Sequence, residues 1–146
     1  MKQKDRYDTA HLDEKQFEPG SRRRVLKNLL HITSNRDMDR LEGREQVRAL
    51  EELASLYDRD HQFTAVDVCR MHQLWLGSIY SWAGKYRQVN VKKGTFAFAA
   101  AAQIAKLMTE FEAGPLTRYT PCHPAGTESF AAGLAAVHVE LVLIHP

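Results

Sequence analysis

The sequence has little cysteine, no strong charge of either sign and no unbroken apolar run of membrane-spanning length. Its 146 residues include two cysteines, Cys69 and Cys122, which lie far apart and have no metal-ligand or redox spacing around them. A disulfide framework is therefore not indicated, and we expect two reduced thiols. Twenty basic and 18 acidic residues leave a formal net charge of +2, which is too small to indicate a nucleic-acid or membrane partner.

A secretory leader and a membrane span are also missing from the pattern. The N-terminal residues are charged and lack the apolar core of a signal peptide. The longest apolar stretch, 130–144, is interrupted by His138 and Glu140. We expect it to fall short of the roughly 18 apolar residues that a membrane span needs. The protein is therefore expected to be soluble and cytoplasmic.

Helical periodicity dominates what the sequence does contain, after a polar arm over residues 1–20. Thr64 and Asp67 predict a capping box at the start of one helix, and Gly114-Pro115 is expected to stop another. The last helix is apolar almost all round, which is typical of a central, buried helix. The segments with apolar residues at helical spacing, and hence the expected helices, are 21–31, 37–57, 64–84, 99–111 and 127–143.

One segment between the expected helices alternates polar and apolar residues instead. Residues 86–91 and 96–98 show this alternation, and Lys92–Thr95 between them has turn composition. We therefore expect a small β-hairpin over about 86–98 in an otherwise all-α fold. Taken alone, the Lys92-Lys93-Gly94 turn would be an ordinary exposed hairpin turn.

Four stretches carry a more specific signal, and the middle two are hard to meet by chance. They are RVLKNLL followed by IT at 24–33, LWLGSIYSWAG at 74–84, YRQVN through KGTFAFA at 86–99, and VHVELVLIHP at 137–146. Taken together and in this order, they resemble the Fic (filamentation induced by cAMP) family of protein adenylyltransferases. The resemblance covers nearly the whole chain.

The resemblance implies a fold and an activity. The fold is a Fic-type helical domain over residues 21–146, with the hairpin as a flap over a nucleotide site. The activity is transfer of AMP from ATP to a Tyr, Thr or Ser hydroxyl of a target protein. After the central helix, here about 127–143, the family carries the motif His-Pro-Phe-x-(Asp/Glu)-Gly-Asn-x-Arg. His145 and Pro146 match its first two positions and the sequence stops there, so we expect an incomplete, truncated Fic domain.

Individual residues take their expected roles from the same resemblance. His145 is the expected catalytic base, a role that suits imidazole because it titrates near neutral pH. Lys93 and Gly94 match the flap pair near the nucleotide, where Lys93 would meet a phosphate as a point charge. ATP and Mg²⁺ are implied, but the family's metal ligand, phosphate cradle and arginine follow the histidine and have no counterpart in this sequence. Because phosphoryl-type transfer depends on positioning and charge stabilisation, we expect residues 1–146 alone to be inactive.

A non-catalytic interpretation stays open beside the enzymatic one. An enzyme remnant or protein-binding module would use the hairpin and an exposed helical groove to contact a partner. The expected partners are a target protein with an acceptor hydroxyl, an inhibitory antitoxin and a second copy of the chain, with no nucleic acid and no membrane. Glu42-Gly43 matches the end of the family's inhibitory Ser/Thr-x-x-x-Glu-Gly/Asn pattern, but Met38 stands at the hydroxyl position, so no inhibitory role is assigned.

Overall fold

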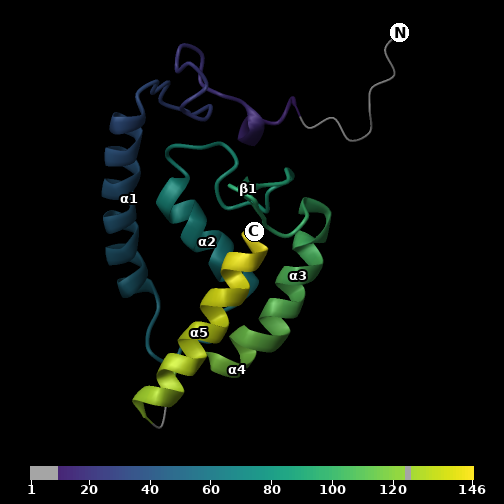
Figure 1. Ribbon diagram of the computed structural model, residues 1–146. Helices are drawn as coiled ribbons and strands as arrows, with labels where there is room; N and C mark the ends of the chain where they lie inside the picture. Colours follow the sequence, from purple (N-terminus) through teal and green to yellow (C-terminus); the bar gives the residue numbers. More distant parts are fainter. Residues whose placement is uncertain (1–9, 124–125) are drawn as a thin grey trace.

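The computed structural model describes residues 10–123 and 126–146 as a mostly helical fold with one two-stranded hairpin, which confirms the predicted fold class. α1 packs on α2, α2 on α3, and α3 on α5, while the N-terminal segment crosses one end of the helices (Figure 1). The main elements are α1 (Asn35–Leu56), α2 (Ala65–Leu76), β1 (Lys92–Lys93), β2 (Phe96–Ala97), α3 (Ile104–Phe111) and α5 (Thr127–Ile144). Short turns of helix complete them: η1 (Asp13–Lys15), η2 (Ala101–Gln103), η3 (Glu112–Leu116) and α4 (Thr117–Tyr119).

Side-chain caps define the starts of α1 and α2. Ser34 Oγ accepts a hydrogen bond from the Asp37 amide at 3.4 Å. Thr64 and Asp67 form the predicted capping box, in which each side chain accepts from the other residue's backbone N–H. These bonds satisfy amides that the first helical turn leaves without intrahelical partners.

Two clusters of buried side chains hold the elements together. The first joins the N-terminal segment to α1, α2 and the turns after α2, and contains Val25, Met38, Leu76, Ile79, Tyr80 and Ala83. The second joins α2, α3, η3 and the last residue of α5, and contains Ala65, Ile104, Met108, Phe111, Leu116 and Ile144. Ile144 therefore fixes the C-terminal end of α5 in the core, directly before the predicted base.

The predicted helix over 21–31 is wrong, because the structure has turns and no helix there. Arg22, Arg23 and His31 adopt positive φ angles of 56°, 60° and 55°, which interrupt a right-handed helix. The buried Asn28 side chain accepts hydrogen bonds from backbone amides and donates to backbone carbonyls of the same segment. Such local side-chain bonds compete with the helical ladder.

The predicted polar arm is also more structured than expected within its described part. Residues 1–9 lie outside the described residues, and the described part of the arm is 10–20. There Glu18 is buried, accepts from the Asn28 amide at 3.1 Å and lies 2.9 Å from His31 Nδ1. The described part of this segment, residues 10–20, is thus packed onto the rest of the domain.

The helix after Thr64 and the hairpin are both shorter than predicted. α2 ends at Leu76, and turns rather than helix lead on to Gly84, whose φ is 77°. The hairpin pairs Lys92 with Ala97 and Lys93 with Phe96, and the expected strand over 86–91 does not form. The hairpin therefore has a Gly94-Thr95 turn and a longer loop on its N-terminal side.

Gly114-Pro115 does not stop the helix that precedes it. η3 is a π-helical turn that contains Pro115, and it carries α3 on into α4 without a break. Proline lacks the amide proton of an ordinary helical bond and its ring crowds the preceding turn. The wider turn is a common way to accommodate such an irregularity inside a helix.

α5 begins and ends close to the predicted residues, but it is not buried. Its N-cap is Gly126 rather than Thr127, and within it only Gly133 and Ile144 are buried. By length and composition α5 would be able to cross a membrane, with a mean hydropathy of 1.5 over 18 residues of which 11% are buried. The prediction that no segment approaches a membrane span is thus wrong by this measure. The large apolar side chains of α5 that remain exposed are Phe130, Leu134, Val139, Val142 and Leu143.

Candidate active site

His145 lies at the C-terminal end of α5, beside the hairpin (Figure 1). It is the C-cap, with φ 47° and ψ 64°, and its amide donates to the Leu141 carbonyl at 2.9 Å. Its imidazole stacks on the ring of Phe98, with ring centroids 4.5 Å apart and planes 25° apart. The left-handed cap turns the chain away from the helix axis, so the imidazole meets the last residue of the predicted hairpin.

Arg87 connects the end of α5 to the segments that enter and leave the hairpin. Its Nε donates to the His145 carbonyl at 2.6 Å, and its Nη2 donates to the Ile144 carbonyl at 3.0 Å and to the Ala99 carbonyl. Its Nη1 donates to the Val89 carbonyl at 2.7 Å. Arg87 belongs to the family-like stretch 86–99, but no role was predicted for it.

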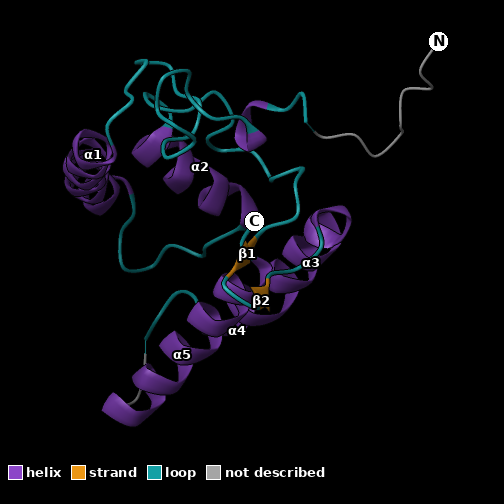
Figure 2. Ribbon diagram, turned by 45° about the horizontal axis from the view of Figure 1, so that its top comes forward, coloured by secondary structure: helices purple, strands orange, loops and turns teal. Residues whose placement is uncertain are grey.

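The hairpin and helix also meet through the main chain and through aromatic rings. The Ala99 amide donates to the Leu143 carbonyl at 3.1 Å, and the rings of Phe96 and Phe98 form an edge contact at 5.2 Å. Phe98 therefore contacts His145 on one side and Phe96 on the other. In Figure 2 the strands lie next to the C-terminal end of α5.

The surroundings of His145 lower the pKa of its imidazole. Partial burial, which disfavours the charged ring, is the larger cause, and the nearby positive charge of Arg87 adds to it. His72 of α2 also has a lowered pKa, from burial and then from repulsion by His145. The Gly84 amide donates to His72 Nδ1 at 3.0 Å, so the unprotonated form of that nitrogen is stabilised. These surroundings thus favour the neutral form of His145, which has a lone pair available for a proton.

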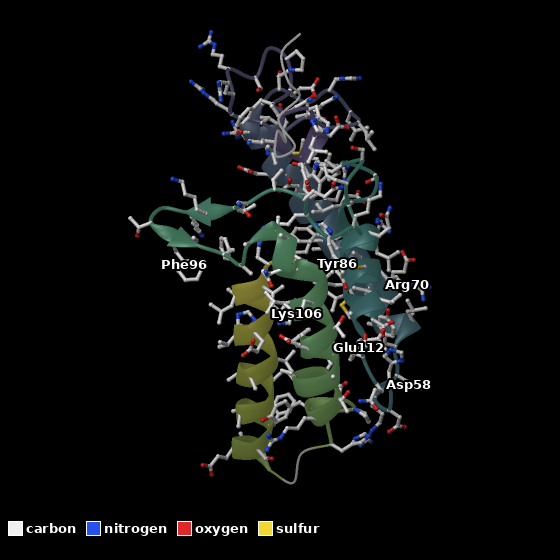
Figure 3. All side chains as sticks on the ribbon, turned by 90° about the vertical axis from the view of Figure 1, so that its right-hand side faces the viewer. Asp58, Arg70, Tyr86, Phe96, Lys106 and Glu112 are labelled. Carbon is white, nitrogen blue, oxygen red and sulfur yellow. The ribbon has the colours of Figure 1, made fainter. Side chains whose placement is uncertain are left out.

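Lys93 and Gly94 lie at the tip of the hairpin, away from His145. Gly94 has φ 59°, and a Cβ added there would meet no atom within 4 Å, so the conformation and not crowding favours glycine. Within the described residues, the Lys93 side chain makes no ion pair or hydrogen bond. Figure 3 shows Phe96, the strand partner of Lys93, on a hairpin that extends away from the helices. The structure therefore links the predicted flap residues to the predicted base through the hairpin backbone and not by contact.

Among the residues that the structure describes, those around His145 do not form a magnesium site. The charge of Arg87 acts on the His145 imidazole, and His145 acts on the neighbouring His72. None of these three groups is a carboxylate. In the described part of the chain, no three His, Cys, Asp or Glu side chains are close enough to hold a metal ion. Because Mg²⁺ prefers oxygen ligands, none of the chemistry below is assigned to a metal held by these residues.

Three kinds of comparison place this geometry among known proteins. The Fic/DOC family model matches residues 62–146. A search of curated proteins gives no match. Among solved structures, the N-terminal Fic domain of a Bartonella effector protein from Bartonella sp. AR 15-3 is similar, with a TM-score of 0.77 and 21% identity over 93% of this chain.

Two further structures carry nucleotides. The N-terminal Fic domain of a putative cell filamentation protein from Bartonella quintana, with bound ADP, has a TM-score of 0.76 and 22% identity. The BepC protein of Bartonella tribocorum, with bound AMPPNP, has a TM-score of 0.76 and 19% identity. Each match covers 93% of this chain, which spans 69% and 70% of these two structures and 65% of the first. At these identities the likeness shows the fold alone.

Proposed function

This chain belongs to the Fic/DOC family, and on that premise we propose that it carries the base and flap of a protein adenylyltransferase. The reaction would move AMP from ATP to a hydroxyl side chain of a target protein. The observation that carries the proposal is the position of His145, whose imidazole is held at a helix end beside a hairpin and has a lowered pKa.

In the proposed reaction His145 removes the proton of the incoming hydroxyl. The hydroxyl oxygen then forms a bond to the α-phosphorus of ATP, and the bond from that phosphorus to the bridging oxygen breaks. Pyrophosphate leaves with the electron pair, and the proton remains on the imidazole until it passes to solvent. A base with a lowered pKa suits this role because most of it is unprotonated at neutral pH.

Nucleotide binding is proposed from the family and from the nucleotide-bound neighbours. Lys93 would meet a phosphate if the nucleotide bound near the tip of the hairpin. Its ammonium has no partner within the described residues, so it is free to do so. The remaining phosphate and metal groups of the family motif have their places after the two positions that His145 and Pro146 match. We therefore propose that residues 1–146 alone do not transfer AMP, because transfer depends on those groups.

The test compares residues 1–146 with a chain in which the same residues are followed by the rest of the family motif and its next helix. Each is incubated with a lysate and ATP labelled at the α-phosphate or the γ-phosphate. We expect labelled protein only from the extended chain and only with α-labelled ATP. His145→Ala should abolish labelling, while His138→Ala, at an exposed position of the same helix, should preserve it. Labelling by the extended His145→Ala variant would refute the assigned base.

A second candidate function is protein binding without catalysis, and the exposed apolar residues of α5 favour it. Leu134 and Val139 are 54% and 52% exposed, and apolar residues clustered on one helix are typical of a surface that another element or protein covers. The partner would be a target protein, an antitoxin or a second copy of this chain. A cytoplasmic location is predicted with it. ATP separates the two candidates, because it should raise the melting temperature of the extended chain if that chain is an enzyme and leave it unchanged if it only binds proteins.

A further inference from the structure

Arg87 is buried, with 8% of its surface exposed, and all its hydrogen bonds go to main-chain carbonyls. The acceptors belong to three separate pieces of chain. Val89 lies on the loop that enters the hairpin, Ala99 follows the hairpin, and Ile144 and His145 end α5. One planar guanidinium with donors in fixed directions can satisfy such a set, whereas the single ammonium of a lysine cannot.

The burial of this charge is notable because no carboxylate neutralises it directly. Within the described residues Arg87 has no ion pair, and the carboxylate that attracts it electrostatically, Glu14, instead accepts from the Gln88 amide at 2.7 Å. A buried charge is costly unless hydrogen bonds compensate it. Here two of the compensating carbonyls are the last ones of α5, where the helix dipole places partial negative charge.

The conformation of His145 gives these bonds a consequence for the site. A non-glycine residue at φ 47° is held in a sparsely populated region and needs surrounding contacts to keep it there. The bond from Arg87 Nε fixes the His145 carbonyl, and the stack on Phe98 fixes its ring. The bonds to Val89 and Ala99 attach the same guanidinium to the hairpin.

We propose that Arg87 is a positioning residue that locks the His145 peptide and the segments on both sides of the hairpin into one rigid unit. The base and the flap then keep a fixed relation to each other, and loss of the guanidinium frees the hairpin from α5. Its meaning for catalysis rests on the function proposed above, but the lock itself can be measured without any activity. Failure of AMP transfer and failure of the lock are therefore separate results.

The test uses amide hydrogen exchange on residues 1–146 with Arg87→Met and Arg87→Lys. The reporters are the Ala99 amide, which bonds to Leu143, and the His145 amide, which bonds to Leu141. We expect both to exchange at least about tenfold faster in each variant, as charge-assisted hydrogen bonds are lost. The matched control is Arg48→Met, because Arg48 Nη2 donates to the Leu74 carbonyl at 2.6 Å far from the site. Arg48→Met should change the exchange rates of the Ala99 and His145 amides only by the amount that its effect on global stability explains.

NMR titration of the His145 ring separates position from charge. The charge of Arg87 acts on this ring, which in turn acts on His72, and His72 is unchanged in every variant. Both variants should lose the Phe98 ring-current shift and raise the pKa of His145, because the ring loses burial, which is the larger cause of its lowered pKa. The rise should be greater in Arg87→Met, which also removes the positive charge, than in Arg87→Lys, which keeps it. If Arg87→Met does not fold, Arg87→Lys still carries the exchange test. The proposal would be overturned if the Ala99 and His145 amides stayed protected from exchange in a folded Arg87 variant. It would also be overturned if they lost no more protection than in Arg48→Met.

Discussion

Replacement of Ile144 by alanine should destabilise the fold far more than the same change at its neighbour. Ile144 is 3% exposed and belongs to the cluster that joins α2, α3 and η3 to the end of α5, whereas Leu143 is 44% exposed. A buried Ile→Ala change leaves a cavity and costs about 2–5 kcal/mol. Leu143→Ala removes a similar number of methyl groups from a half-exposed site and should cost about 1 kcal/mol or less.

The free energy of unfolding is measured by equilibrium urea denaturation of Ile144→Ala, Ile144→Val and Leu143→Ala. The valine variant removes one methylene and should cost about 0.5–1.5 kcal/mol, so it gives a value even if the alanine variant does not fold. A domain of this size has about 5–15 kcal/mol of total stability, so the alanine variant approaches the limit at which it unfolds.

The result that would refute this reasoning is an equal loss at the two neighbouring positions. It would mean that Ile144 is no more buried in solution than Leu143, and hence that the end of α5 is not anchored in the core. The position of His145 depends on that anchor, because the imidazole follows Ile144 directly. The measurement therefore tests the geometry of the candidate site as well as its stability.

Three further outcomes are expected. Burial lowers the pKa of His145 and His72 in the native state, so the unfolded chain binds more protons. The free energy of unfolding, measured against pH, should therefore fall as the pH decreases through about 6.5 and below. A flat profile would contradict this. Thr64→Ala removes half of the capping box and should cost about 0.5–2 kcal/mol by urea denaturation, more than Thr95→Ala at the exposed hairpin turn. Leu134→Glu should shift the chain toward monomer in size-exclusion chromatography if exposed α5 residues drive self-association, and an unchanged elution volume would exclude that surface.

The elements that the sequence predicted best are those specified by local chemistry. α1 and α5 start and end within about two residues of the prediction, and the capping box of α2 depends on two side chains three positions apart. The hairpin was predicted at about the right place, but its first strand is Lys92–Lys93, inside the predicted turn, and not the alternating segment 86–91. The segment 21–31 was not predicted correctly, because its backbone bonds to Asn28 and Glu18, and the buried Glu18 lies outside the periodic stretch.

Burial on α5 was mispredicted for a different physical reason. A helix that is apolar all round is expected to be covered by something that excludes water. The sequence of the helix does not specify which elements or molecules cover it. In the structure α3, η3 and α4 cover one face only, and Phe130 and Leu134 on other faces remain 41% and 54% exposed. The same composition is compatible with a core helix, a protein interface or a membrane segment.

Arg87 was missed because each of its acceptors is a main-chain carbonyl, which every residue type provides. Two of them lie 57 and 58 positions away in the sequence, so no pattern of side chains predicts the contact. What the sequence did contain was a single arginine in a segment with no acidic residue nearby, between Tyr86 and Val89. A charged residue in such a position either faces solvent or is compensated by backbone groups, and only the fold distinguishes these cases.

The two predicted site positions differ in how far they are organised before any ligand arrives. His145 is fixed through its amide, its carbonyl and its ring, so its direction is set in advance. Lys93 lies on an exposed hairpin and must lose side-chain freedom when it meets a phosphate, which costs up to about 2 kcal/mol. Preorganised groups contribute most to a chemical step, and groups that are ordered by the ligand contribute mainly to affinity and selectivity. In an active, extended chain Lys93→Ala should therefore raise KM for ATP with a small change in kcat, whereas loss of His145 should remove kcat itself.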